Sequence, residues 1–206
     1  MKLAVFGATG RVGSRVVNMA VRENIEVNAH VRDIKRAEQI IPEANLIKGD
    51  VTKSKDVEAT LRDCELVFSA LGTDKTDTLS KAIPIMIQLM KKHQVERIIT
   101  IGTAGILNSR FEENKFRFET NESKRRLTFA AEEHLSVFKT LSQSSLSWTI
   151  LCPTYLPDGE AEGRVRYEQN FLPEGGKKIT VGDTAQFAFQ EIKTPRFPHL
   201  RVGLSD

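Results

Sequence analysis

VFGATGRVG, residues 5–13, has a glycine at every third position: Gly7, Gly10 and Gly13. Residues 3–6, which precede the first glycine, are apolar strand formers, and after the last glycine apolar side chains recur at helical spacing. The glycines therefore mark a sharp turn from a strand into a helix. A turn of this kind brings backbone amides to a pyrophosphate at the positive end of the helix.

Each glycine of this turn has its own physical reason. Gly7 permits the turn off the strand, Gly10 lets the backbone approach a pyrophosphate, and Gly13 lets the helix pack closely on the sheet. An isolated glycine triplet is a weak signal, since glycines also mark ordinary tight turns. The strand before it, the amphipathic helix after it and a second strand at the expected distance favour dinucleotide binding. The amides predicted to face the phosphates are those of Thr9, Gly10, Arg11 and Val12.

The composition is that of an ordinary globular protein. With 206 residues, 40% of them hydrophobic and 28% charged, the chain is long enough for a single α/β domain spanning residues 1–206. The net charge of +3 is too small to indicate nucleic-acid binding. Two cysteines, Cys64 and Cys152, are too few for a disulfide scaffold, and no apolar run approaches the roughly 20 residues of a membrane span. The four histidines lack metal-ligand spacing, so we expect a cytoplasmic protein without metal, membrane or nucleic-acid contacts.

Strand and helix patterns alternate along the chain, which predicts an α/β fold with parallel strands and right-handed crossovers. The expected architecture is a doubly wound Rossmann domain with a mainly parallel sheet, whose ligand site lies at the C-terminal edge of the strands. Asp33 and Ser54 are good N-caps for two helices, and Pro84 predicts that its helix starts near Ile83 or kinks there. The expected strands are 2–6, 25–31, 45–48, 65–70, 96–101, 147–151, 164–168 and 199–204, and the expected helices are 11–23, 33–40, 54–62, 79–93, 121–143 and 182–192.

Two long irregular stretches, 103–120 and 152–178, follow the ends of strands at the ligand-binding edge. The first contains Phe111, Phe116 and Phe118, which either form the floor of a site for a planar ligand or pack the loop on the core. Basic residues in and after this stretch form either an anion-attracting rim or a solvated face: Arg110, Lys115, Arg117, Lys124, Arg125 and Arg126.

The end of the second predicted strand indicates the type of cofactor. An acidic residue here binds the ribose hydroxyls of NAD, whereas a nearby arginine accommodates the 2′-phosphate of NADP. The chain reads AHVRD at 29–33, in which Asp33 is better placed to cap the next helix. Arg32 is therefore predicted to bind a 2′-phosphate, in preference to being a solvated surface charge. The expected cofactor is NADP(H).

Several segments, taken in order, resemble one known group of proteins. This group is the atypical short-chain dehydrogenases/reductases that bind NAD(P)H, the relatives of the NmrA-like proteins and of biliverdin reductase B (flavin reductase). The resemblance spans nearly the whole chain, and its motifs are more specific for the superfamily than for any substrate. The matching segments are VFGATGRVGSRVV (5–17), HVRD (30–33), KGDV (48–51), VFSALGT (67–73), RIITIGTAG (97–105), LSQSSLSWTILCPTYL (141–156) and KKITVGDTAQFAFQEI (177–192).

The resemblance implies roles for residues at the ends of four strands. Asp50 and Val51 match the adenine-contacting pair after the third strand, and Thr103 stands in the place of the family's catalytic serine. Many relatives have Arg-Pro after the sixth strand, where this chain has Cys152-Pro153 and so lacks one charged contact. The turn that lines the cofactor is matched by Ala70, Leu71, Gly72 and Thr73, and the nicotinamide end by Cys152, Pro153, Thr154 and Tyr155.

The chain departs from the family pattern at the catalytic acid. Short-chain dehydrogenases use a Tyr-x-x-x-Lys pair on the helix before the sixth strand, and this sequence has no such pair. Ala130 and His134 occupy the two places. Proteins similar to biliverdin reductase B also lack the tyrosine, and they pass hydride to flavins and tetrapyrroles. The catalytic candidates are Thr103, His134 and Tyr155, although His134 is equally well interpreted as an ordinary helix residue.

Two functions are compatible with these features. The first is an NADPH-dependent reductase that transfers hydride to a planar acceptor of flavin, quinone or tetrapyrrole type, with the proton supplied by water. The second is a non-catalytic NADP(H)-binding sensor of NmrA-like type, which changes its contacts with a protein partner. An open substrate edge would favour the reductase, and a site filled by side chains would favour the sensor. A sugar-nucleotide epimerase is disfavoured, because the tyrosine and a sizeable C-terminal substrate domain are missing.

Overall fold

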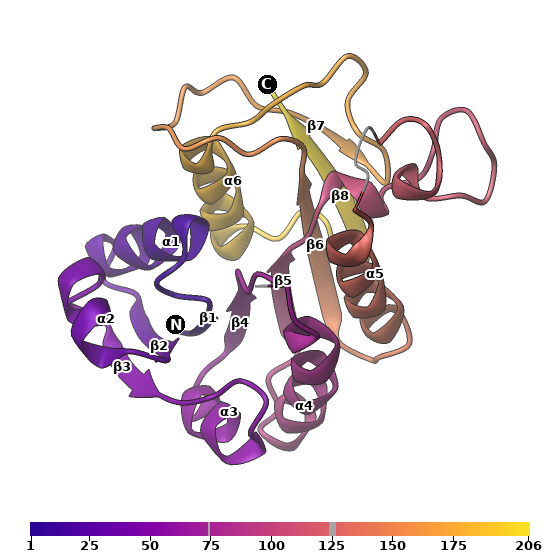
Figure 1. Cartoon of the computed structure of the whole chain (residues 1–206). Coiled ribbons are helices and arrows are strands. Elements are labelled where there is room, and N and C mark those ends of the chain that lie inside the picture. Colours follow the sequence, from indigo (N-terminus) through magenta and orange to yellow (C-terminus); the bar gives the residue numbers. More distant parts are fainter. Residues whose placement is uncertain (74, 124–126) are drawn as a thin grey trace.

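The strands form one eight-stranded sheet in the order β3-β2-β1-β4-β5-β6-β8-β7 (Figure 1). The computed structural model of the protein describes residues 1–73, 75–123 and 127–206. Neighbouring strands are parallel, except that β7 pairs antiparallel with β8. The predicted α/β fold with a doubly wound, mainly parallel sheet is confirmed. The strands are β1 (Lys2–Phe6), β2 (Glu26–Val31), β3 (Asn45–Lys48), β4 (Leu66–Ser69), β5 (Arg97–Ile101), β6 (Ser147–Pro153), β7 (Arg166–Gln169) and β8 (Leu200–Ser205).

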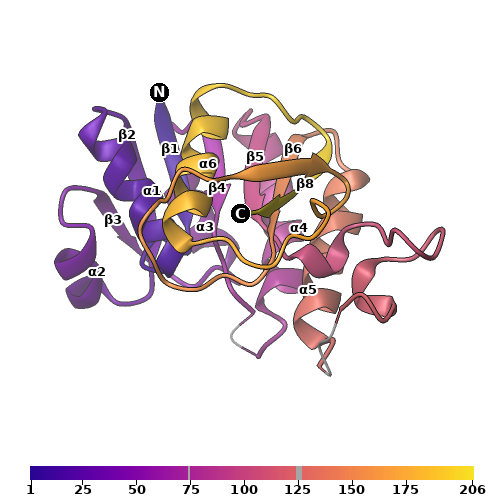
Figure 2. The ribbon, with the colours of Figure 1, turned by 90° about the horizontal axis from the view of Figure 1, so that it is seen from above.

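Helices cover both faces of the sheet, as Figure 1 and the view from above in Figure 2 show. Leu3 and Val5 of β1 pack with α1, α2 and α6, whereas Ala4 and Phe6 pack with α3, α4 and α5. This alternation follows from the two-residue period of a strand, and it buries β1 on both sides. The helices are α1 (Arg11–Arg22), α2 (Ile34–Ile40), α3 (Ser54–Leu61), α4 (Thr78–Lys92), α5 (Phe129–Ser142) and α6 (Val181–Lys193).

The helix predicted over 121–143 is shorter in the structure, because α5 begins only at Phe129. The earlier residues are held by the preceding loop: the carboxylate of Glu122 accepts hydrogen bonds from the Arg110 amide and from Arg117 Nη1, both at 2.9 Å. These loop contacts, which helical periodicity cannot register, replace the first predicted turns. The run Lys124–Arg126 lies outside the described residues.

One of the two N-cap predictions needs correction. Asp33 caps α2 as predicted, accepting a hydrogen bond from the Arg36 amide at 3.1 Å. Ser54 is the first residue of α3, and its N-cap is Lys53. Of the two alternatives for Pro84, a helix start near Ile83 is excluded, because α4 begins at Thr78 and the proline lies inside it; a kink at Pro84 stays a prediction.

The stretch 103–120 packs on the core, as the simpler interpretation of its aromatic residues predicts. It contains two short 3₁₀ helices, η1 (Ala104–Ile106) and η2 (Arg117–Glu119). Phe116 and Phe118 pack against the core, whereas Phe111 is 83% exposed at the surface. The basic residues of the stretch are paired with carboxylates rather than open to an anion: Arg110 with Glu168, Lys115 with Glu112, and Arg117 with Glu122.

Among the residues that the structure describes, no helix has both the length and the apolar character needed to cross a membrane. The same part of the chain holds no group of three or more His, Cys, Asp or Glu side chains arranged to bind a metal. The one-domain organisation and the cytoplasmic location stay predictions.

Candidate functional site

The turn between β1 and α1 leaves no room for a side chain at two of its glycines. Gly7 has a φ of +75°, and a β-carbon there would lie 2.4 Å from the carbonyl oxygen of Ala70, just after β4. A β-carbon on Gly13 would lie 2.1 Å from the carbonyl oxygen of Gly7, so α1 packs directly on the turn. Backbone geometry therefore requires glycine at both positions.

Gly10 has a different environment. It is the N-cap residue of α1, and its amide donates to the Gly7 carbonyl at 3.0 Å. Within the described residues, no side chain makes a capping hydrogen bond to this helix, and its first turn contains no acidic residue. The backbone amides at the positive, N-terminal end of α1 are thus open to an anion.

A cavity of about 320 Å³ opens beside this turn, at the C-terminal edge of β1, β2, β3 and β4. It brings together predicted residues that are far apart in the sequence, as expected at the switch point where the strand order reverses. The predicted residues that line it are Gly7, Thr9, Gly10, Arg32, Asp50, Val51, Ala70, Leu71 and Gly72. The lining also includes His30, Val31, Arg36 and Thr78, which the sequence motifs did not single out.

Two arginines border the cavity where β2 ends. Arg32 follows the strand, Arg36 lies in the first turn of α2, and both residues are exposed. Asp33 lies between them in sequence, and its carboxylate is occupied in capping α2. Two arginine residues therefore line the cavity in the region where an NAD-type site has a free carboxylate.

Asp50 supplies the acidic group of the cavity after β3. Its carboxylate accepts hydrogen bonds from the Thr52 amide at 2.9 Å and from the Thr52 hydroxyl at 2.7 Å. These bonds hold the pKa of Asp50 below its ordinary value, so the side chain is ionised at neutral pH. The Asp50 amide in turn donates to Asp56 Oδ2 at 2.9 Å, which fixes the turn.

His30 is a buried polar residue in the cavity wall. Its Nδ1 lies 2.8 Å from the hydroxyl oxygen of Thr60, and that hydroxyl donates its own proton to the Asp56 carbonyl at 3.0 Å. Burial lowers the pKa of His30. Its Nε2 is buried and has no hydrogen-bond partner among the described residues. A buried polar atom of this kind is typical of a site that is completed by a polar ligand.

None of the three catalytic candidates lines the 320 Å³ cavity. Thr103 follows β5, is buried, and caps η1 by accepting from the Gly105 amide at 3.4 Å. His134 of α5 is half-buried beside Ser69 and Thr100, in a space of only about 10 Å³. Tyr155 follows β6 and is 66% exposed.

The other predicted contact residues do not line the cavity. Cys152 is fully buried in β6, and burial raises the pKa of its thiol to about 12. Its side chain is therefore closed to a ligand, and any contact would come from the backbone. The Thr154 amide extends the β6–β8 pairing by donating to the Leu204 carbonyl at 3.2 Å. The remaining predicted residues outside the cavity wall are Arg11, Val12, Gly13, Thr73 and Pro153.

Arg11 and Arg15 of α1 hold the loop that follows β6. Arg11 Nη1 donates to the Leu156 carbonyl at 2.8 Å and to Asp158 Oδ1 at 3.2 Å. Arg15 makes a two-point contact with Glu160, at 2.7 and 2.8 Å. The amide of Arg11, rather than its side chain, remains available to the cavity side of the turn.

Comparison with known proteins identifies the family. A family model described as NAD(P)H-binding matches residues 7–195. The chain belongs to this family. The resemblance to the NAD(P)H-binding atypical short-chain dehydrogenase/reductase group is thus confirmed, and the cavity lies at the glycine turn where the match begins.

Individual relatives cover nearly the whole chain. The uncharacterized protein YwnB of Bacillus subtilis (strain 168) is 24% identical over 212 residues, which are 98% of this chain and 96% of that protein. A candidate NADH-flavin reductase from Streptococcus pneumoniae TIGR4 has a similar structure, with a TM-score of 0.85, 26% identity, and coverage of 100% of this chain and 99% of that one. ChuY, an anaerobilin reductase from Escherichia coli O157:H7, has a TM-score of 0.82 at 22% identity, with coverage of 100% and 97%.

Proposed function

We propose that this protein is a reductase that uses NADPH to transfer hydride to a planar acceptor of flavin, quinone or tetrapyrrole type. The observation that carries the proposal is the cavity at the glycine turn, where Arg32 and Arg36 belong to the wall at the end of β2 and the carboxylate of Asp33, which lies between them in sequence, is engaged in capping α2. The family match supports a nicotinamide cofactor. The names of the pneumococcal flavin reductase and of ChuY support the class of acceptor.

The residues of the cavity fit a phosphorylated dinucleotide. The open amides of α1 would bind the pyrophosphate, and glycine at position 10 lets the backbone come close to it. Asp50 would accept hydrogen bonds from the adenosine, and the unpartnered Nε2 of His30 would complete its bonding there. Arg32 and Arg36 would bind the 2′-phosphate that distinguishes NADP from NAD.

Proton transfer is the part of the chemistry that the chain supports least. α5 has Ala130 and His134 in the two places of the usual tyrosine and lysine. The Thr103 hydroxyl is buried and caps η1, and Tyr155 is largely exposed. When bound, the cofactor supplies the hydride. A delocalised acceptor holds the resulting negative charge until water delivers a proton, so the missing acid is tolerable for planar acceptors and disabling for ketones.

One observation favours the second function, a cofactor sensor without catalysis. The space beside His134 is only about 10 Å³ and is closed by Ile83, Met86 and Val137. This volume is room for one water molecule at most, so the space is filled by side chains rather than open to an acceptor. A protein that binds NADPH and reduces nothing would use cofactor occupancy to change its contacts with a partner.

Oxidation of NADPH by the purified protein separates the two functions. The reaction is followed by the loss of reduced-nicotinamide absorbance with flavins, quinones and linear tetrapyrroles as acceptors, and with alcohols and ketones as controls. Tight NADPH binding together with turnover of a planar acceptor supports the reductase. Tight binding without turnover of any acceptor supports the sensor.

A further inference from the structure

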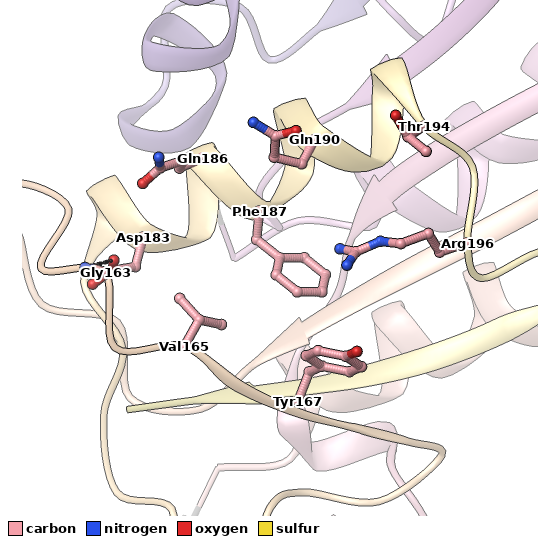
Figure 3. A pocket seen from close by; sticks show the side chains of 9 residues that line it. All are labelled: Gly163, Val165, Tyr167, Asp183, Gln186, Phe187, Gln190, Thr194 and Arg196. Carbon is pink, nitrogen blue, oxygen red and sulfur yellow. Dashed lines mark hydrogen bonds between the residues drawn. The ribbon is translucent and has the colours of Figure 1, made fainter.

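A second cavity, of about 460 Å³, lies between β7, the loop before it and α6. It shares no lining residue with the cavity at the glycine turn. Figure 3 shows Phe187 of α6, Tyr167 of β7 and Arg196 directed toward a common space, with Val165 beside them. Pockets of about 300–1,000 Å³ with aromatic walls and a few polar groups are typical of small-molecule sites.

Aromatic rings form the wall of this second cavity. Tyr167 and Phe187 have ring centroids 5.5 Å apart, and Phe187 stacks on Phe197 at 5.9 Å with an interplanar angle of 15°. Phe187 and Phe197 are buried, whereas Tyr167 is 48% exposed. A ligand in the cavity would therefore meet one fixed ring face and one partly solvated ring.

Arg196 brings a positive charge to the same place. The Cζ atom of Arg196 lies 4.9, 5.0 and 5.6 Å from the ring centroids of Phe197, Phe187 and Tyr167. These contacts hold the planar guanidinium against the rings. Its side chain is 40% exposed, and within the described residues its Nη atoms donate no hydrogen bond. The forked donors of this guanidinium therefore remain free for a ligand.

The charge of Arg196 is only weakly compensated. The nearest carboxylate, Glu191, lies 3.9 Å from Arg196 Nε and is fully buried. Glu191 also accepts from Arg97 Nη2 at 3.3 Å and from the Phe197 amide at 3.2 Å. Two arginines therefore share one carboxylate, which leaves a net positive charge at this end of the cavity.

The opposite end of the cavity is negative. Asp183 lies there, and its carboxylate accepts from the Glu162 and Gly163 amides at 3.0 and 2.9 Å and from the Thr180 hydroxyl at 2.8 Å. An anionic group would therefore settle at the Arg196 end and avoid the other. A ligand with a single negative charge fits this polarity better than one with several charges.

We propose that this cavity is a second binding site, which takes a small aromatic carboxylate with its carboxylate on Arg196 and its ring against Phe187 and Tyr167. A carboxylate matches the planar fork of a guanidinium through two parallel hydrogen bonds. A flat ring matches the aromatic wall, and the amides of Gln186 and Gln190 on α6 border the cavity where ring substituents would lie. The site is independent of the nicotinamide cofactor.

The test is a titration of the ¹⁵N-labelled full chain with benzoate, followed in amide spectra. Benzamide, which keeps the shape without the charge, and acetate, which keeps the charge without the ring, are the matched probes. We expect saturable shifts of the Gly163, Gln186 and Gln190 signals with benzoate, and at least about tenfold weaker binding of the other two probes, the loss corresponding to one charge-assisted hydrogen bond.

Two substitutions examine the guanidinium itself. Arg196→Gln should weaken benzoate binding about tenfold or more and leave benzamide binding unchanged. Arg164→Gln is the matched control, because Arg164 is an exposed arginine beside the cavity but not in its lining, and it should leave both affinities unchanged. Folding of each variant is checked from its spectrum. The proposal is overturned if wild-type protein binds benzoate no better than benzamide, or if folded Arg196→Gln protein keeps the benzoate affinity.

Discussion

The carbonyl oxygen of Ala70 lies 2.4 Å from the place where a β-carbon on Gly7 would stand. The turn after β1 and the end of β4 thus meet backbone against backbone, at the point where the strand order reverses. Three residues further on, a β-carbon on Gly10 would meet the Gly7 carbonyl oxygen at 3.1 Å and the Ala70 carbonyl oxygen at 3.9 Å. Glycine at position 7 therefore lets the turn pack against the end of β4, whereas glycine at position 10 lets a ligand approach the backbone of the turn.

The two glycines should respond differently to substitution. Gly7→Ala forces a side chain into a left-handed conformation and against backbone, so it should destabilise the protein by several kcal/mol, of which about 1–2 kcal/mol comes from the conformation alone. Gly10→Val should keep the fold. It should weaken NADPH binding more than about a hundredfold, since two charge-assisted bonds to phosphate contribute roughly 3–6 kcal/mol. Urea unfolding and a binding titration measure the two effects, and undiminished NADPH affinity in Gly10→Val would refute the phosphate site.

Arg32 should set the choice of cofactor. Arg32→Ala removes a guanidinium at the 2′-phosphate, so it should raise the Kd for NADPH by about ten- to a hundredfold and leave the Kd for NADH nearly unchanged. Arg36→Ala should act in the same direction. Both constants are measured by titration of the reduced cofactors, and an equal loss for NADPH and NADH would place Arg32 elsewhere.

Lys35→Ala is the matched control for the two arginines. Lys35 is exposed and lies in the same turn of α2, but it does not line the cavity. Its removal changes the net charge by the same amount, so a general electrostatic effect would weaken NADPH binding in this variant too. We expect its NADPH affinity to change less than about threefold, within the range of a surface substitution.

No single side chain should be indispensable as a proton donor. Groups that act as general acids or bases contribute about 10²–10⁴-fold to the rate. Thr103→Ala, Tyr155→Phe and His134→Ala should each reduce kcat with a planar acceptor by about a hundredfold or less. Steady-state kinetics of the three variants decides the matter. If any one of them abolishes turnover while NADPH binding is intact, that residue is the acid and water is not the proton source.

Asp183 should make stability depend on pH. Burial acts to raise its pKa, but hydrogen bonds from the Gly163 amide, the Thr180 hydroxyl and the Glu162 amide outweigh burial and hold the pKa below the ordinary value. The folded pKa is thus lower than the unfolded one of about 3.9, so the carboxylate stabilises fully above that pH and less as pH falls through the folded pKa. Asp183→Asn should cost about 1–3 kcal/mol at neutral pH.

The pH dependence of the Asp183→Asn effect serves as its control. The difference in unfolding free energy between wild-type protein and Asp183→Asn should shrink as the pH is lowered below about 3.9, because Asp183 then takes up a proton in the unfolded chain before it does so in the folded protein. Denaturant unfolding at several pH values gives this difference. A difference that stays constant with pH would assign the effect to packing rather than to charge.

Much of the first half of the fold could be predicted from the sequence, because its signals are local. The glycine turn, the apolar run of β1 and the helical spacing of α1 are each complete within a few residues. The start of α5 could not be predicted, since it depends on Glu122 bonding to Arg110 and Arg117 across the loop. The helical periodicity of the sequence before Phe129 is the same whether or not these loop contacts form, so it cannot reveal them.

The lining residues of the cavity that belong to a sequence motif could be predicted. Those that only the fold brings to the cavity were harder to predict. Arg36 borders the cavity because α2 turns back at the end of β2, and its spacing of four from Arg32 was the available signal. His30 carried no signal as a single buried histidine on a strand. Cys152 was expected at the nicotinamide end from family resemblance, but the alternation of β6 turns its side chain into the core.

The most direct test of the central claim is NADPH oxidation by the purified protein across a panel of flavins, quinones and linear tetrapyrroles, with simple ketones and alcohols as controls. The account predicts turnover with at least one planar acceptor, loss of that turnover in Gly10→Val, and no reaction with the controls. Tight NADPH binding without reduction of any planar acceptor, or ready reduction of a simple ketone, would contradict it.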